Sequence, residues 1–312
     1  MRNQELIRKA DMALSDLSSN GGLLNPEQTD QFLRTLIESP TILQNCRTVA
    51  MGAPQMKINK IGFGSRILRP GVEATALSSS DRVKPDLGQI QLNTKEVLAE
   101  IHLPYDVIED NVERGNINVP LQGNPGGLHQ TIVDLIAERA ALDLEELGLK
   151  GDTTSGDAYL ALNDGWLKMA GTNVVDAAGA TYTKDIAKSV LKATPPKYLR
   201  NRASMVHFAS INNETELRDT YANRIGGLGD ANVQGNLPLY VYGSKVVGVP
   251  LMPGANSLFT DPLNLIFGIQ RNITIEYTKD ITARVFIIVL SARIAFQIEL
   301  ADAITKVINI TG

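Results

Sequence analysis

Residues 56–103 restrict the fold more than any other stretch, because two extended runs flank a segment rich in Pro, Gly, Ser and charged residues. In the outgoing run Ile61, Phe63 and Ile67 alternate with small or charged residues. In the returning run Ile90 and Leu92 keep one parity, whereas Val97, Ala99, Ile101 and Leu103 keep the other. We therefore expect a ribbon with its tip at residues 70–86, whose returning strand changes its buried face near residues 94–96 and joins a packed sheet. An isolated two-stranded ribbon is marginal in water, so this hairpin needs cover from outside itself.

Length and composition narrow the class of protein. A chain of 312 residues with 43% hydrophobic and 21% charged residues is typical of a globular protein with more than one small core. The net charge of −4 gives no electrostatic basis for sequence-independent binding to DNA. A single cysteine, Cys46, excludes a disulfide within the chain and fits a reducing compartment. The longest apolar run, residues 285–290, is far shorter than the roughly 20 residues of a membrane span. The N-terminus carries acidic residues and lacks a long apolar stretch, so it is unlike a secretory signal.

Helical spacing predicts a two-helix N-terminal arm and one long helix. The first helix places Leu6, Ala10, Leu14 and Leu17 on one face, and the second begins at Asn25–Pro26, carries Phe32, Leu33, Leu36 and Ile37, and ends at Pro40. The long helix follows residues 124–127 and reaches about residue 151, which gives a length of roughly 30–35 Å. Its expected apolar stripe consists of Ile132, Leu135, Ile136, Ala140, Leu144 and Leu147.

A second block of mixed elements begins near residue 183. It predicts a helix stopped by Pro195 and Pro196, a strand over 203–210, a helix over 212–225, a glycine-rich loop at 226–236 and a strand near 245–253. Residues 283–312 predict strands with a turn at 301–303. The order of elements indicates an α+β protein.

The residues that could take part in catalysis or in binding a metal or phosphate do not form a predicted site. His102, His129 and His207 lie in unrelated contexts without metal-ligand spacing, and Cys46 lacks the surroundings of an activated nucleophile. The glycine-rich pieces lack the spacing and the following helix of a phosphate-binding loop. Asp152 and Asp157 flank a Thr-Thr-Ser-Gly segment, where we expect a turn closed by its own side chains in preference to a calcium site. We therefore predict no catalytic, cofactor-binding or metal-binding residues.

The order of these parts resembles the major capsid proteins of tailed phages, which share the Hong Kong 97-like fold. The resemblance rests on five pieces taken together: the arm at 24–43, the ribbon ending in "AEIHLPYDVIEDN", the long helix running into "LGLKGDTTSGDAYLALNDGWL", the block from "PPKYLRNRASMVHFAS" to "YGSKVVGVPLMP", and the closing strands from residue 271. It implies an N-terminal arm at 1–51, an extended E-loop hairpin at 52–102, a peripheral domain at 103–182 and 271–312 with its spine helix at 124–151, and an axial domain at 183–270.

The resemblance also implies which residues touch neighbouring subunits. These are Ile61, Phe63, Arg66, Arg82, Lys84, Ile90 and Leu92 in the E-loop; Leu6, Leu14, Phe32 and Leu36 in the arm; and Gly226, Gly227, Gly229, Asp230 and Asn232 in a loop near the capsomer centre. The implied function is a non-enzymatic structural subunit that forms the pentamers and hexamers of an icosahedral head enclosing double-stranded DNA. It would assemble in the host cytoplasm and reside in the virion. Its implied partners are further copies of itself, a separate scaffolding protein, a portal and, in some shells, a decoration protein, with no cofactor and no membrane.

Two other interpretations remain open from the sequence. An encapsulin-type shell subunit has the same fold and encloses enzymes in place of DNA. An enzyme with a site near residues 150–166 would instead use acids such as Asp152, Asp157 and Asp164.

Overall fold

The computed structural model describes residues 41–63, 66–68, 70, 78, 80, 82–104, 128–222 and 238–311. The two predicted arm helices and the glycine-rich loop at 226–236 lie outside these residues. Within the described residues, no helix has the length and apolar character needed to cross a membrane.

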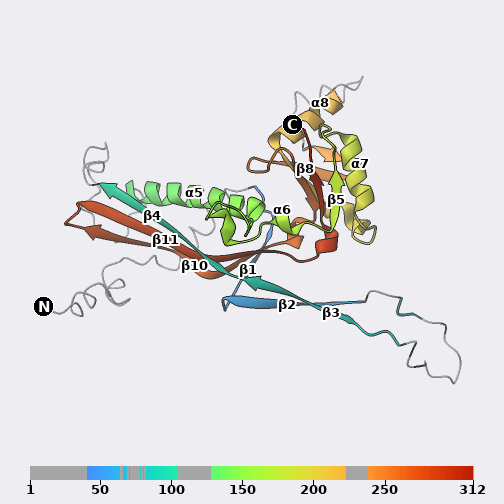
Figure 1. Cartoon of the computed structure of the whole chain (residues 1–312), viewed down its shortest axis with the longest axis horizontal. Helices are drawn as coiled ribbons and strands as arrows, with labels where there is room; N and C mark the ends of the chain where they lie inside the picture. The colour runs from blue at the N-terminus through green and yellow to red at the C-terminus, as the bar shows by residue number, and fades with distance from the viewer. Residues whose placement is uncertain are drawn as a thin grey trace.

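One sheet has four strands in the order β1-β10-β11-β4. Its long central hairpin joins β10 (Leu265–Asp280) to β11 (Val285–Ile298), and β1 (Arg47–Ala50) and β4 (Lys95–Pro104) form its edges. β1 runs parallel to β10, whereas β11 runs antiparallel to both of its neighbours. The long helix α5 (Leu128–Lys150) lies along one face of this sheet (Figure 1).

The structure confirms the predicted long helix as α5, but the buried side of the helix is rotated relative to the predicted apolar stripe. Ile136, Leu144 and Leu147 are buried as expected, and they pack with β11 side chains such as Phe296. Leu135, however, is 60% exposed, so its place in the stripe was wrong. Adjacent positions on a helix differ by about 100°, and the sheet takes the side that carries Ala137 and Ala141 in place of Leu135.

A second sheet has six strands in the order β5-β12-β9-β6-β8-β7. Helices α7 (Lys184–Ala193) and α8 (Ile211–Ala222) contribute Val190 and Leu217 to a core on one of its faces, together with Phe259. The other face contributes Phe208 and Leu258 to the core that also contains α5. The strands are β5 (Asn173–Asp176), β6 (Val206–Ser210), β7 (Tyr240–Val241), β8 (Ser244–Val249), β9 (Ser257–Thr260) and β12 (Thr305–Ile308).

The chain crosses between the two sheets at places that hydrogen bonds hold together. Short 3-10 helices η3 (Pro262–Asn264) and η4 (Ala301–Ala303) lie on two of these crossings. The Asn264 side chain accepts a bond from the Leu300 amide at 2.7 Å and donates to the Leu300 carbonyl at 3.1 Å. The third crossing, after α6 (Trp166–Met169), brings in Asn173, which donates to the carbonyl of Ile304 at 3.0 Å. Buried Trp166 packs edge-on against Phe296, so a shared core also joins the sheets.

The sheets do not follow the domain boundaries expected from the resemblance. β12 lies in residues 271–312 but pairs with β5 and β9 of the six-stranded sheet. β10 begins at Leu265, inside the expected 183–270 segment, and belongs to the four-stranded sheet. Short strands such as β5 and β12 carry too little pattern to reveal which distant strand they join. A division by sheets would therefore move residues 173–176 and 305–308 to the axial part and residues 265–270 to the peripheral part.

The third sheet is the predicted ribbon. It pairs β2 (Gln55–Gly62) with β3 (Asp86–Asn93) and projects from the rest of the molecule (Figure 1). Thr94 alone separates β3 from β4, where the chain enters the four-stranded sheet. This confirms the predicted change of face near residues 94–96. The remaining described elements are the 3-10 helices η1 (Leu160–Leu162) and η2 (Leu199–Ser204).

Candidate assembly surface

The base of the ribbon is fixed to the four-stranded sheet by apolar packing. Leu92 and Met51 are buried in a small cluster with Ile266 and Ala295, against which Met56 and Ile58 pack. The cluster packs closely on the backbone of Gly268, where an added Cβ would lie 2.8 Å from both Leu92 Cδ2 and Met51 Sδ. This close approach lets the ribbon lie directly on the β10 backbone.

Hydrogen bonds mark the point where the ribbon leaves the body. The Thr94 amide donates to the Pro54 carbonyl at 2.9 Å, and the Thr94 hydroxyl donates to the same oxygen at 3.1 Å. From β11, the Gln297 side-chain amide donates to the Gln91 carbonyl at 3.2 Å. The base of the ribbon is therefore held both by its own strands and by the sheet beneath.

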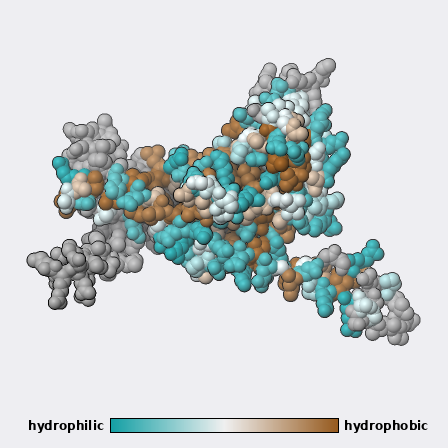
Figure 2. All heavy atoms as spheres, viewed as in Figure 1, coloured by the Kyte–Doolittle hydropathy of each residue, from teal (hydrophilic) through white to brown (hydrophobic). Residues whose placement is uncertain are grey.

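The distal end of the ribbon exposes large apolar side chains. Ile61 and Leu87 lie directly opposite each other across the two strands, and they are 72% and 75% exposed. Phe63 follows at 57% exposure, and Ile67 and Leu68 lie further along in exposed positions. Figure 2 shows apolar residues interleaved with polar ones along this projection. Single exposed apolar residues are ordinary, but a cross-strand pair continued by an aromatic ring indicates a contact surface.

The predicted E-loop residues divide into two groups. Ile61, Phe63, Arg66, Arg82 and Lys84 are exposed and are free to meet another molecule. Ile90 and Leu92 are only 7% and 1% exposed. Leu92 packs in the cluster at the ribbon base, and Ile90 pairs with Ile58, which packs against that cluster. Both side chains are already covered within the chain itself, so little of either is left for the expected contact with a neighbouring subunit.

Sequence reasoning missed Leu87 as a candidate contact residue. Leu87 has the opposite parity to Ile90 and Leu92, so a single-strand pattern leaves it outside the apolar face. Its importance comes from the register, which sets it opposite Ile61. The signal available in the sequence was the shared odd parity of Ile61 and Phe63, which also conflicts with the even parity of Met56 and Ile58 in the same strand.

The other predicted contact residues lie outside the described part of the chain. They are Leu6, Leu14, Phe32 and Leu36 of the arm, and Gly226, Gly227, Gly229, Asp230 and Asn232 of the loop.

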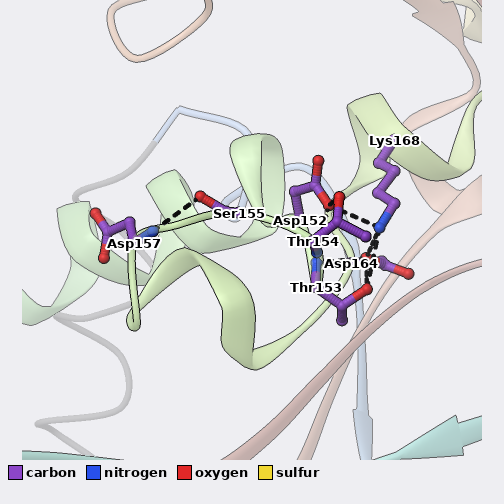
Figure 3. A network of polar contacts seen from close by, with 7 residues as sticks. All are labelled: Asp152, Thr153, Thr154, Ser155, Asp157, Asp164 and Lys168. Carbon is purple, nitrogen blue, oxygen red and sulfur yellow. Dashed lines mark hydrogen bonds and ion pairs between the residues drawn. The ribbon is translucent and has the colours of Figure 1, made fainter.

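The segment after α5 contains a dense polar network, which is the place where an enzyme site had been considered (Figure 3). Lys168 Nζ donates to Asp152 Oδ1 and to Asp164 Oδ1, each at 2.7 Å, and to Thr153 Oγ1 at 3.0 Å. The Thr154 amide and hydroxyl both donate to Asp152 Oδ1 at 2.8 and 2.6 Å. This confirms the predicted turn closed by its own Asp and Thr side chains.

One lysine and two carboxylates stabilise one another's charged forms in this network. Bonds from Lys168 and then Thr154 hold the pKa of Asp152 well below its usual value. Burial alone would raise the pKa of Asp164, but bonds from Lys168 and Thr153 outweigh it and lower that pKa. The bonds to Asp152 and then Asp164 raise the pKa of Lys168. A lysine kept protonated and carboxylates kept ionised are suited to fixing a loop and poorly suited to transferring protons near neutral pH.

The surroundings of His207 and Cys46 are also those of residues that support the fold. His207 is buried, its Nδ1 lies 3.1 Å from the Tyr182 hydroxyl, and burial lowers its pKa to about 3. The Cys46 thiol donates to the Leu43 carbonyl, and burial raises its pKa to about 12, as fits an inert thiol. Among the described residues, no three His, Cys, Asp or Glu side chains gather in an arrangement able to hold a metal ion.

Capsid proteins are among the known proteins that are similar to this chain. The chain is 42% identical, over 327 aligned positions covering 99% of both sequences, to the putative prophage capsid protein YqbE of Bacillus subtilis (strain 168). No family model matches the sequence.

Among solved structures, the fold is similar to a chain of the satellite phage P4 procapsid with its size determination (Sid) protein. That match has a TM-score of 0.67 and 16% identity, and it covers 99% of this chain and 98% of the other. The fold is also similar to the capsid of the native GTA particle, with a TM-score of 0.63 and 15% identity over 88% of this chain and 90% of the other. These structural matches are too distant in sequence to show more than the fold.

Proposed function

Because the chain belongs to the family of tailed-phage major capsid proteins with the Hong Kong 97-like fold, we propose that it builds the pentamers and hexamers of an icosahedral head that encloses double-stranded DNA. It acts as a structural subunit and catalyses no reaction. Head-to-tail contacts around a rotation axis generate closed rings, and a ribbon reaching from one copy to the next suits that arrangement.

One observation carries the proposal at the level of this chain: the ribbon has a fixed base and an uncovered apolar end. Its base is buried against β10, whereas Ile61, Phe63 and Leu87 are exposed at its far end. A hairpin of this kind is stable along its whole length only where another surface covers it. In a shell of many copies, each ribbon contact adds to the others, so contacts that are weak alone hold the whole particle together.

The proposal extends to partners and location. A separate scaffolding protein shapes the precursor shell, a portal occupies one vertex, and some shells add a decoration protein. The mature protein resides in the virion, after assembly in the host cytoplasm. A net charge of −4 suits a wall that confines DNA without binding its sequence. The ribbon and α5 are the elements in which we place the change of packing when a round precursor expands.

Electron microscopy of particles made by expression with and without the neighbouring genes tests this function. We expect free capsomers or irregular shells from the chain alone, and uniform large heads when a scaffolding protein is supplied. Small uniform shells that form without scaffold and load a tagged enzyme would instead identify an encapsulin-type compartment. A protein that remains monomeric under all these conditions would contradict both.

A further inference from the structure

The two faces of the ribbon carry apolar residues at different heights. The register places Met56 with Leu92 and Ile58 with Ile90 on one face, which we call the inner face. Because side chains alternate along a strand, the Ile61–Leu87 pair lies on the opposite face, which we call the outer face. The apolar surface therefore changes sides between Ile58 and Ile61.

The inner face is apolar only where the protein's own sheet covers it. Met56, Ile58 and Leu92 belong to the cluster on β10 and β11. Beyond that cluster the inner face continues with Lys60 opposite Gly88, where a Cβ added at Gly88 would lie 3.9 Å from Lys60 Cβ. Within the paired strands Gln55–Gly62 and Asp86–Asn93, no apolar side chain remains on the distal inner face to be covered.

The outer face has the reverse pattern. Near the base it carries polar pairs, Lys57 with Gln91 and Asn59 with Gln89. At the distal end it carries Ile61 and Leu87, which are the most exposed apolar residues of the paired strands. A surface that covers the distal ribbon gains apolar burial only from this side.

Charge indicates what kind of surface fits there. Residues 57–86 contain six Lys or Arg and three Asp or Glu, so this segment is positive. The rest of the chain then holds 24 Lys or Arg and 31 Asp or Glu, and is negative. A positive ribbon and a negative body are complementary between two copies of the same chain.

We propose that the body of a second copy covers the outer face of the distal ribbon, so that the ribbon lies between its own sheet at the base and its neighbour at the end, on opposite faces. The inference rests on the proposed assembly of this chain and adds the face through which it occurs. In a ring, each copy then receives one neighbour's ribbon and extends its own.

Paired substitutions on the two faces test the inference. Ile61→Gln with Leu87→Gln removes the apolar outer pair without changing charge, and Lys60→Gln with Gly88→Gln places bulk on the inner face at the adjacent position. Both variants should keep the circular dichroism and melting of the wild-type chain, because the base cluster is untouched. Electron microscopy of particles, made with the wild-type chain under the same conditions, should then show loss of shells for the outer-face variant and normal shells for the inner-face variant.

Each other outcome overturns the inference. Shells lost only in the inner-face variant would place the neighbour on the other side, while leaving the assembly function intact. Normal shells from both variants, as expected if the basic ribbon served packaged DNA, or loss in both would show that the outer face has no special role. A wild-type chain that never assembles would instead contradict the proposed function itself.

Thiol labelling gives a second readout that does not depend on disrupting the shell. In a Cys46→Ala background, the thiols introduced by Ile61→Cys and Lys60→Cys are labelled with a maleimide before and after assembly. We expect the outer-face thiol to react in particles at no more than about one tenth of its rate in free protein, because burial blocks access. The inner-face thiol should change far less, and equal protection of both would overturn the inference.

Discussion

A chain that lacks residues 71–84 is expected to fold normally and to form no closed shells. The base of the ribbon is held by Leu92, Met51 and the bonds at Thr94, and none of these depends on the deleted residues. Ile61 and Leu87 lie outside the deletion and stay in place, but the shortened ribbon loses the tip that continues beyond them toward a neighbour. Burying one apolar side chain of the tip against a neighbour contributes about 1.5–3 kcal/mol, and this gain repeats at every copy of a shell. Circular dichroism and thermal melting should therefore match the wild-type chain, while electron microscopy shows unassembled protein.

The control for this deletion keeps the length of the tip and changes its sequence. A chain in which residues 71–84 are shuffled should assemble if the tip acts mainly as a spacer. Normal particles from the deleted chain would show that the end of the ribbon is dispensable and would contradict its role in assembly.

The second large effect is expected at Gly151, directly after α5. The Gly151 carbonyl accepts a bond from the Gly165 amide at 2.8 Å, so two backbone segments lie against each other there. A Cβ at Gly151 would lie 2.3 Å from the Asn163 carbonyl oxygen and 2.5 Å from that of Leu147. Because backbone atoms cannot rotate away as a side chain can, Gly151→Ala should lower the free energy of unfolding by about 2–3 kcal/mol.

Gly156→Ala is the matched control, since Gly156 lies in the same segment and nothing is within 4 Å of a Cβ there. Its free energy of unfolding should stay within about 0.5 kcal/mol of the wild-type value. Denaturant titration of both variants measures the difference. Equal stability of the two would mean that the end of α5 and the segment at Gly165, just before α6, are not packed as described.

Local patterns predicted the elements whose cause is local. The spacing around residues 128–150 gave α5, and Asp152 with Thr154 gave the closed turn. The change of parity after Leu92 gave the passage from ribbon to sheet at Thr94. In each case the residues that decide the structure are neighbours in sequence, so a short window contains the whole argument.

Features that depend on distant partners could not be predicted in this way. The pairing of β12 with β5 joins strands about 130 residues apart, and neither sequence specifies the other. Leu92 was expected to contact a neighbouring subunit, and its pattern in the sequence gives no sign of the close approach to Gly268 of its own sheet. Leu87 gained its role only from the register with Ile61. Register shifts near Arg271 interrupt the pairing of β10 with β11, so a short window does not show that β10 is one continuous strand.

Hydrogen–deuterium exchange of the ribbon, compared between free protein and assembled particles, tests the central claim most directly. The account predicts that amides of residues 55–63 and 86–93 exchange rapidly toward the distal end in free protein and slowly once particles form. The base near Leu92 should be protected in both states, because the protein's own sheet covers it. Equal, strong protection of the distal amides in the free chain would show that the chain's own surface already covers the ribbon. That result would contradict an assembly in which a neighbouring copy provides this cover.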